Sequence, residues 1–362
     1  MPCQSFRAVL GIDIGAVNVK LACVQGSPAD WRGETTSVPF EEKAFFIDWI
    51  RQSHDQHQAM VVTETVSFSR SLFEGYREGV RWVVEAMGEA CEPGSYRFLG
   101  SGPALLSPEV TLAQPFRVAC RNWMGSAHLA LNELALLRDG LLIDCGTSSL
   151  DVIPVVDGVP RCLDGESDMV WTRLGTGELT LCGVLMSSIQ VITSSIELGG
   201  RPRTLRLCPS AQVGHARVLV GEIPAIPEDR PGDGNFTLRN SHRQLANLLA
   251  ADLETLTLDQ AREAAAYVLQ RQIEMVRETV SRVREHAIAK WDRPFDQAAV
   301  MGLGARILVE PALRGLDLLL TRLDAHALDN AWPNRIDWQA NCETALGAAL
   351  IGLREIDAGR WT

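Results

Sequence analysis

The sequence lacks an excess of basic residues. Its 362 residues include 34 Lys and Arg against 45 Asp and Glu, so the formal net charge is −11. General nucleic-acid binders need a basic footprint, and anionic membrane surfaces attract basic segments, so neither is an expected partner. A phosphorylated small molecule would have to be held locally, by backbone amides, a metal ion or a few placed cations.

Paired cysteines and an apolar leader are also missing. The nine cysteines are scattered without a C-x-x-C pair, which excludes a zinc ribbon or a thioredoxin-like site. They are predicted to be reduced, buried thiols of a cytoplasmic protein. Asp13 interrupts the only early apolar run, so no signal peptide is expected. The longest uncharged stretch, residues 179–196, carries polar residues throughout, and the seven histidines have no metal-ligand spacing.

The chain does contain enough apolar material for a large core, since 46 % of its residues are hydrophobic. At about 150 residues per domain, its length indicates two domains or three. The patterning predicts two α/β blocks, each opening with a strand, a glycine turn and a second strand. We expect an N-terminal lobe over residues 1–137 and a C-terminal lobe over 138–342. A final helix within 343–362 is expected to pack back on the first lobe.

Several further elements follow from local pattern. Apolar residues at helical spacing predict a long amphipathic helix over residues 258–289. An Ala- and Leu-rich segment predicts a helix over 126–137, and residues 116–120 are a candidate strand. Residues 199–234 are rich in proline and glycine and are predicted to form an irregular insertion near a cleft.

A short pattern occurs twice, once in each block. Asp13 and Gly15 follow an apolar strand in the first block, and Asp144 and Gly146 do so in the second. This repeat indicates a duplicated fold with a pseudo-twofold cleft. An aspartate at a strand end can contact Mg²⁺, usually through water, and the glycine lets backbone N–H groups of the turn face a phosphate. Two facing turns would clamp a di- or triphosphate; the alternative is that both aspartates merely cap turns.

A third element is consistent with such a cleft. Residues 298–305 form an apolar strand that runs into the turn Gly302-Leu-Gly304. In ATPase-like folds with a divided phosphate site, this turn lies under the adenosine. Gly302 and Gly304 are therefore predicted to line a nucleotide-like pocket.

Together these segments resemble the superfamily of acetate and sugar kinases, Hsp70 and actin. More closely, the chain resembles the hydantoinase/oxoprolinase-related branch of tetrahydromethanopterin-linked C1 transfer pathway proteins, which includes the aminomethylfuran transferase of methanofuran biosynthesis. The resemblance extends over nearly the full length, and Asn122-Trp123 and Gly177-Glu178-Leu179 are its more specific parts. The matching segments are residues 11–20, 78–80, 122–123, 144–154, 168–184 and 302–304.

The resemblance implies an α/β fold of two ribonuclease H-like lobes with a central cleft. It implies a condensation, not a kinase reaction. The phenol of a tyramine or tyrosine unit bearing glutamate attacks the methylene of an aminomethylfuran diphosphate. Diphosphate then leaves and an ether forms. Mg²⁺ is the implied cofactor, with ATP left open, and the implied partner is a phosphorylated small molecule.

The resemblance also implies roles for individual residues. Asp13 and Asp144 would contact the metal through water, and Lys20 would supply positive charge. Glu178 is a candidate for binding the substrate amine or for general-base work, or equally for a capping hydrogen bond. The implied phosphate-binding residues are Asp13, Gly15, Asn18, Asp144, Gly146, Thr147, Ser148 and Asp151, the last with a hairpin-closing role as its alternative. The implied substrate-pocket residues are Asn122, Trp123 and Arg173.

The chain departs from the family pattern at several cleft positions. Ala16 stands where the family has glycine, Val19 where it has threonine and Met186 where it has arginine. The stretch that contains Phe68 and Ser71 lacks the family's acidic pair. Two alternatives therefore stay open: an ATP-dependent small-molecule kinase or ATPase of the same superfamily, and a non-catalytic relative that binds a pathway partner.

Overall fold

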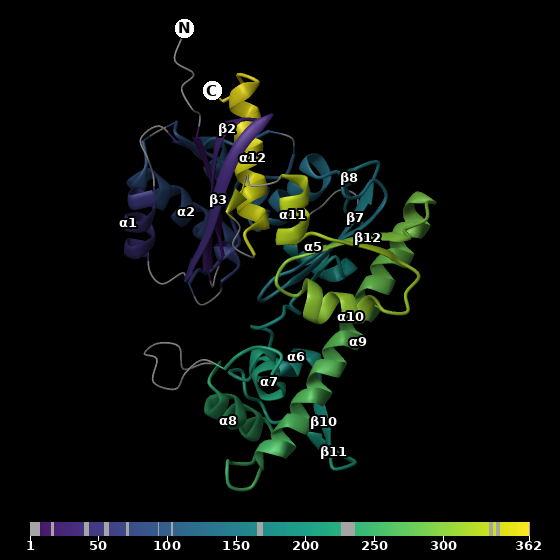
Figure 1. The fold of residues 1–362 in the computed structure, drawn as a ribbon. Coiled ribbons are helices and arrows are strands. Elements are labelled where there is room, and N and C mark those ends of the chain that lie inside the picture. The colour runs from purple at the N-terminus through teal and green to yellow at the C-terminus, as the bar shows by residue number, and fades with distance from the viewer. Residues whose placement is uncertain are drawn as a thin grey trace.

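The structure is a computed structural model, and its ribbon is drawn in Figure 1. It describes residues 8–15, 18–39, 43–53, 58–69, 72–92, 94–102, 104–164, 169–225, 236–332, 336–337 and 341–361.

The first sheet holds the first glycine turn. Its strands are, in spatial order, β14 (Ile336–Asp337), β3 (Asp30–Pro39), β2 (Asn18–Ser27), β1 (Ala8–Ile14), β4 (Gln58–Glu64) and β5 (Tyr96–Phe98). Strands β1, β2 and β3 form an antiparallel meander, whereas β4 and β5 run parallel to β1. Because side chains alternate along β1, Leu10, Ile12 and Ile14 face one side of the sheet and Val9 the other.

Helices cover both faces of this sheet. Helices α1 (Lys43–Ser53) and α2 (Tyr76–Ala90) pack on the face that carries Leu10, Ile12 and Ile14. Helix α12 (Glu343–Asp357) packs on the opposite face, as expected for the C-terminal segment, and also contacts α4 (Trp123–His128).

The second sheet repeats the first. Its order is β13 (Leu319–Arg322), β12 (Gln297–Met301), β6 (Gly140–Cys145), β7 (Leu150–Val156) and β8 (Val159–Pro160), and β9 (Leu179–Thr180) pairs with β7. Strands β6, β7 and β8 form an antiparallel meander, as β1, β2 and β3 do in the first sheet. Strand β12 pairs in parallel with β6, and β13 pairs in parallel with β12. This duplicated topology confirms the predicted fold of two ribonuclease H-like α/β lobes.

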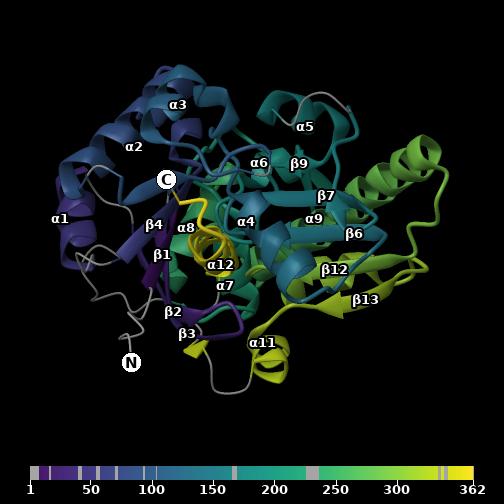
Figure 2. The ribbon, with the colours of Figure 1, turned by 90° about the horizontal axis from the view of Figure 1, so that it is seen from above.

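A shared layer of helices lies between the lobes. Helices α4 and α12 run between the two sheets, which Figure 2 shows in the view from above. Apolar side chains from both sheets, such as Val9 and Leu142, meet these helices in one core. The long helix α9 (Leu258–Trp291) covers the other face of the second sheet and begins with a capping box made by Thr257 and Gln260. The helix predicted for residues 258–289 is thereby confirmed.

The predicted insertion, residues 199–234, is more regular than expected. It contains β11 (Arg201–Thr204) and α7 (Val213–Val220) and is flanked by α6 (Ile189–Ile192), β10 (Ser195–Leu198) and α8 (Leu238–Leu248). These elements gather around one half of α9 (Figure 1). Gly199 and Gly200 take positive φ angles of 59° and 70° and form the turn of the β10–β11 hairpin. The prediction of an irregular segment over residues 199–234 is therefore wrong for β11 and α7, and residues 226–234 lie outside the described residues.

Two local predictions are also wrong. Residues 116–120 form no strand, because Pro115 starts a 3₁₀ turn at Pro115–Arg117. The predicted helix over 126–137 ends early. Helix α4 stops at His128 and passes into a π-helical turn at Leu129–Glu133, after which Ala135 has a φ of 48°.

The remaining helices are short: α3 (Pro108–Ala113), α5 (Val170–Thr176), α10 (Glu310–Leu313) and α11 (Ala325–Ala331). Within the described residues, no helix combines the length and the apolar character that crossing a membrane requires.

Candidate active site

The two glycine turns have matching backbone geometry. In the first lobe, the Gly15 N–H donates to the Asn18 carbonyl oxygen at 2.9 Å. In the second, the Gly146 N–H donates to the Ser149 carbonyl oxygen at 3.0 Å. The strand register pairs Asp13 with Lys20 in the first lobe, and Asp144 with Asp151 in the second. The two predicted phosphate turns are therefore equivalent at these described positions. Ala16, in the first turn, lies outside the described residues.

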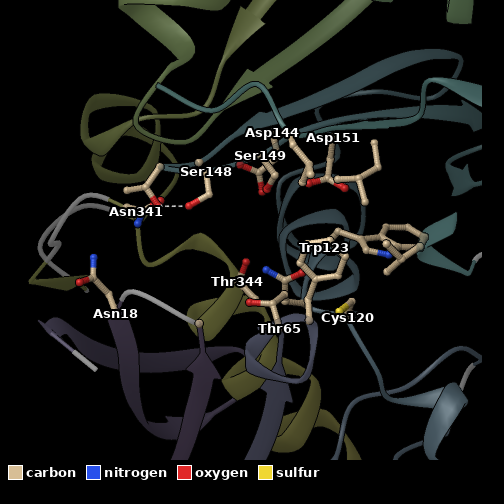
Figure 3. A pocket seen from close by; sticks show the side chains of 18 of the residues that line it. Asn18, Thr65, Cys120, Trp123, Asp144, Ser148, Ser149, Asp151, Asn341 and Thr344 are labelled. Carbon is tan, nitrogen blue, oxygen red and sulfur yellow. Dashed lines mark hydrogen bonds between the residues drawn. The ribbon is translucent and has the colours of Figure 1, made fainter. Parts of the chain in front are cut away.

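Both turns border one cavity between the lobes, with a volume of ≈ 190 Å³. Figure 3 shows Asp144, Ser148, Ser149 and Asp151 on one side and Asn18, Thr65 and Thr344 across from them. Of the predicted site residues, the structure brings these to the cavity wall: Gly15, Asn18, Lys20, Asn122, Trp123, Asp144, Gly146, Thr147, Ser148, Asp151 and Arg173. Phe68, in a stretch that departs from the pattern of the family that the chain resembles, also lines the cavity.

In the first turn, charge is neutralised within the hairpin. The Lys20 Nζ lies 2.6 Å from Asp13 Oδ2, and the Asp13 side chain is fully buried. Burial alone would lower the pKa of Lys20, but the Asp13 carboxylate raises it above its ordinary value. The other oxygen of Asp13, Oδ1, is buried and has no hydrogen-bond partner in the described part of the chain.

In the second turn, two like charges oppose each other. Burial and the facing Asp151 carboxylate raise the pKa of Asp144 to about 6. Asp151 itself is neutralised by Arg173, whose Nη1 lies 2.9 Å from its Oδ1. The Arg173 guanidinium also lies over the ring of Trp123, 4.6 Å from the ring centroid, and donates to the Glu178 carbonyl oxygen at 3.1 Å.

The backbone beside the second turn is held by the segment that follows β9. The Leu185 and Met186 N–H groups both donate to the Thr147 carbonyl oxygen, at 2.9 and 2.8 Å. A Cβ on Gly183 would lie 2.4 Å from backbone atoms of Ser148, so only glycine allows this approach. The Met186 position thus supports the turn through its main chain.

Glu178 does not line the cavity. Its Oε1 accepts a hydrogen bond from the Leu163 N–H at 3.0 Å, and its Oε2 accepts one from the Thr176 hydroxyl at 2.6 Å. Glu178 follows α5 and does not begin a helix, so it does not cap a helix N-terminus. Its carboxylate instead accepts hydrogen bonds from Leu163 and Thr176.

The turn at Gly302 and Gly304 lies against the second phosphate turn and does not line the cavity. Gly302 has a φ of 82°, and a Cβ there would lie 2.6 Å from Asp144 Oδ1. The Gly304 N–H donates to the Cys145 carbonyl oxygen at 2.9 Å. These glycines therefore fix the position of Asp144 and its neighbour, and their role in a nucleotide pocket stays a prediction.

Two acidic residues near the turns were missed in the sequence. Glu343, at the start of α12, is only 6 % exposed and lines the cavity, and burial and the Asp144 carboxylate raise its pKa to about 7. Glu64, at the end of β4, is fully buried, and burial raises its pKa to about 7 despite hydrogen bonds from Ser67 and Cys120. An acid at the end of the apolar stretch 59–63 was a usable signal for Glu64, whereas Glu343 resembles any helix-capping acid.

The residues present suit an indirectly held metal ion better than a directly ligated one. Across the described ranges, no group of three or more His, Cys, Asp or Glu side chains is arranged to hold a metal ion. The orphaned Asp13 Oδ1 and the Asp144 carboxylate are, however, the kind of oxygen atoms that bind hydrated Mg²⁺. Asp144 lines the cavity and Asp13 does not, so these residues suit contact through water, and their metal roles stay a prediction.

Comparison with known proteins gives relatives in sequence and in structure. No family model matches the chain. A protein from Methanocaldococcus jannaschii, named (4-{4-[2-(gamma-L-glutamylamino)ethyl]phenoxymethyl}furan-2-yl)methanamine synthase, is 22 % identical over 303 residues, which are 83 % of this chain and 87 % of that protein. The synthase of the same name from Methanococcus vannielii is 24 % identical over 177 residues, 47 % of this chain and 73 % of its own length.

Among solved structures, a nucleotide-free acetone carboxylase superposes with a TM-score of 0.57 at 9 % identity, covering 95 % of this chain and 70 % of that one. This likeness concerns the fold alone. The sequence relatives agree with the resemblance that the motifs indicate: the chain is similar in sequence to two synthases of a furan-methanamine ether, and its duplicated two-lobed topology is similar to that of acetone carboxylase.

Proposed function

We propose that the chain joins an aminomethylfuran diphosphate to the phenol of a glutamylated tyramine, forming an aryl ether and releasing diphosphate. The observation that carries this proposal is that two equivalent glycine turns border one cavity. A diphosphate has two phosphoryl groups to be held; the second turn offers the hydroxyl groups of Thr147, Ser148 and Ser149, and the first offers the side-chain amide of Asn18. The name of the relatives supports the choice of substrates, because it describes a phenoxymethyl ether on a furan.

The reaction exchanges one carbon–oxygen bond for another. The phenol oxygen bonds to the furfuryl methylene, the bond from that methylene to the diphosphate breaks, and the electron pair leaves with the diphosphate. The furan ring stabilises positive charge that develops on the methylene. The protein must therefore stabilise negative charge on the leaving group and accept the phenol proton.

The charges of the cavity argue for an added cation. Among the described lining residues the cations are Lys20 and Arg173, and both are already paired, with Asp13 and Asp151. The lining also carries the Asp144 and Glu343 side chains. A diphosphate in this cavity needs further positive charge, and Mg²⁺ bound through water to Asp13 and Asp144 would supply it as a Lewis acid.

We assign the acceptance of the phenol proton to Glu343 rather than to Glu178. Both Glu178 oxygens are engaged by Leu163 and Thr176, whereas Glu343 lies in the cavity wall. A base whose pKa lies near the working pH suits proton transfer, and the pKa of Glu343 is raised to about 7.

The test is direct. The protein is incubated with aminomethylfuran diphosphate, γ-glutamyl-tyramine and Mg²⁺, and the ether is followed by mass spectrometry alongside released diphosphate. We expect equal amounts of both products, and loss of both when Mg²⁺ is chelated. The Glu343→Gln variant should form ether at least tenfold more slowly, while Arg203→Ala, on exposed β11, serves as the matched control.

Binding of the diphosphate without ether formation would overturn the proposed reaction and favour a non-catalytic relative. ATP turnover that is lost in Asp13→Ala would favour the kinase or ATPase alternative. We further propose a cytoplasmic location, because the cysteines are scattered without a C-x-x-C pair, as is usual for reduced thiols.

A further inference from the structure

A second cavity lies beside the first. Its volume is ≈ 870 Å³, and its lining comes from the chain after β5, from α4, from the β7–β8 turn and from α12. Trp123 lines both cavities and is the one residue that the two linings share among the described residues. The space that holds the two glycine turns and the larger second cavity therefore meet at Trp123.

Trp123 is placed to meet a ligand at this boundary. Its side chain is 4 % exposed, and its Nε1 has no hydrogen-bond partner in the described part of the molecule. A buried indole N–H normally finds an acceptor, because leaving it unpaired costs free energy. On the reaction side, the face of the ring is covered by the Arg173 guanidinium.

The second cavity combines an apolar floor with a basic rim. Leu99, Ala127 and Ile351 contribute apolar surface. The rim carries three arginines, two of which are already committed: Arg354 binds Glu133 through two hydrogen bonds of 2.6 and 2.7 Å, and Arg360 binds Glu355.

The third arginine of the rim, Arg161, is exposed and forms no ion pair with any described residue. An arginine fork over apolar surface is a site for a carboxylate that is attached to an apolar stem. The Arg161 charge contributes, after those of Arg293 and Arg138, to the lowered pKa of Asp157, but with no ion pair among the described residues its guanidinium is available to a further carboxylate.

We propose that this second cavity binds the tail of the acceptor, with the carboxylate of its amino-acid group on Arg161 and its linker along Trp123. The inference rests on the proposed function and assigns the acceptor to two subsites. The phenol lies on the reaction side of Trp123, and the aminoethyl linker and the charged end lie on the other. Arg161 is then a residue that determines specificity and takes no part in the bond-forming step.

The test compares two acceptors and two variants. Calorimetric titration with γ-glutamyl-tyramine and with plain tyramine gives the binding preference of the wild-type protein without requiring turnover. We expect a preference for the glutamylated compound that falls about tenfold in Arg161→Ala and is partly restored in Arg161→Lys, as for the loss of one charge-assisted hydrogen bond at an exposed site. Arg203→Ala is again the matched control, because it removes an exposed arginine from the distant β10–β11 hairpin.

Turnover measurements then distinguish the acceptor subsite from the proposed reaction. Where ether forms, Arg161→Ala should raise KM for the glutamylated acceptor with little change in kcat, since the interaction is made equally in the ground and transition states. Ether formation with the same acceptor preference in Arg161→Ala as in wild type overturns the subsite alone. Absence of ether, with an Arg161-dependent binding preference, overturns the proposed reaction and leaves the subsite standing.

Discussion

The two glycine turns are closed by the same backbone hydrogen bond but carry different charges. Where the first hairpin opposes Asp13 with Lys20, the second opposes Asp144 with Asp151. The first turn is thus neutral within itself, whereas the second places two carboxylates across an antiparallel pair, which is destabilising, and depends on Arg173 from α5 for compensation. Duplication has kept the geometry of the turns and has divided their tasks. The first turn holds a buried ion pair, and the second holds a carboxylate, Asp144, whose pKa is raised to about 6.

Breaking the first pair should have the largest effect. In Lys20→Met the fully buried Asp13 loses the one cation that pairs with it among the described residues, and we expect a loss of about 3–5 kcal/mol of stability, as when one member of a buried ion pair is removed. Denaturant unfolding measures this loss as a decrease in the free energy of unfolding. The double variant Asp13→Asn, Lys20→Met removes the stranded charge and should recover much of the loss. Equal losses in the single and double variants would show that the pair is not what neutralises this turn.

Removing the compensating arginine of the second turn should cost less. In Arg173→Met the stranded carboxylate, Asp151, is 14 % exposed and keeps some contact with water, so we expect a loss of about 2–4 kcal/mol. The contact with the Trp123 ring is lost as well. The Asp151→Asn background should reduce the effect of Arg173→Met in a double-mutant cycle. Additive losses would mean that Arg173 acts through Trp123 and Glu178, and that the two turns are not electrostatic opposites.

These contrasts also mark what the sequence could and could not predict. The strand–Asp–Gly pattern was sufficient for the two turns, because alternation and glycine chemistry act over a few residues. It could not show that Glu343 joins Asp144, since α12 brings Glu343 to the cavity from far along the chain. Glu178 shows the reverse. Its motif is specific, but the Leu163 N–H and the Thr176 hydroxyl occupy its carboxylate oxygens. The motif alone does not reveal these hydrogen bonds, because they depend on how the chain folds around Glu178.

The contribution of Asp144, in the second turn, to stability should depend on pH. The pKa of Asp144 is raised to about 6 from the ordinary 3.8, so its protonated form is favoured in the folded protein. This contribution to stability is present at low pH and is lost as the pH rises toward 6. The Asp144→Asn variant should not lose this stability as the pH rises. The melting temperature of the variant, relative to that of wild type, should therefore increase from pH 4 to pH 6. Parallel profiles for the two proteins would contradict the charge conflict.

The smallest effect is expected at a carboxylate of opposite behaviour, outside both turns, because its partner Arg354 is 48 % exposed and solvent screens the pair. Burial alone would raise the pKa of Glu133, but hydrogen bonds from His128 and Arg354 lower it to about 2. Its contribution to stability is therefore complete above the ordinary pKa of 4.5 and is lost as the pH falls toward 2. Glu133→Gln should melt lower than wild type at pH 6 and approach it at pH 3, the reverse of Asp144→Asn. Because the two variants replace one carboxylate each by its amide, each is the control for the other: a shared direction of change would mean that the profiles report the net charge of the protein and not the two sites.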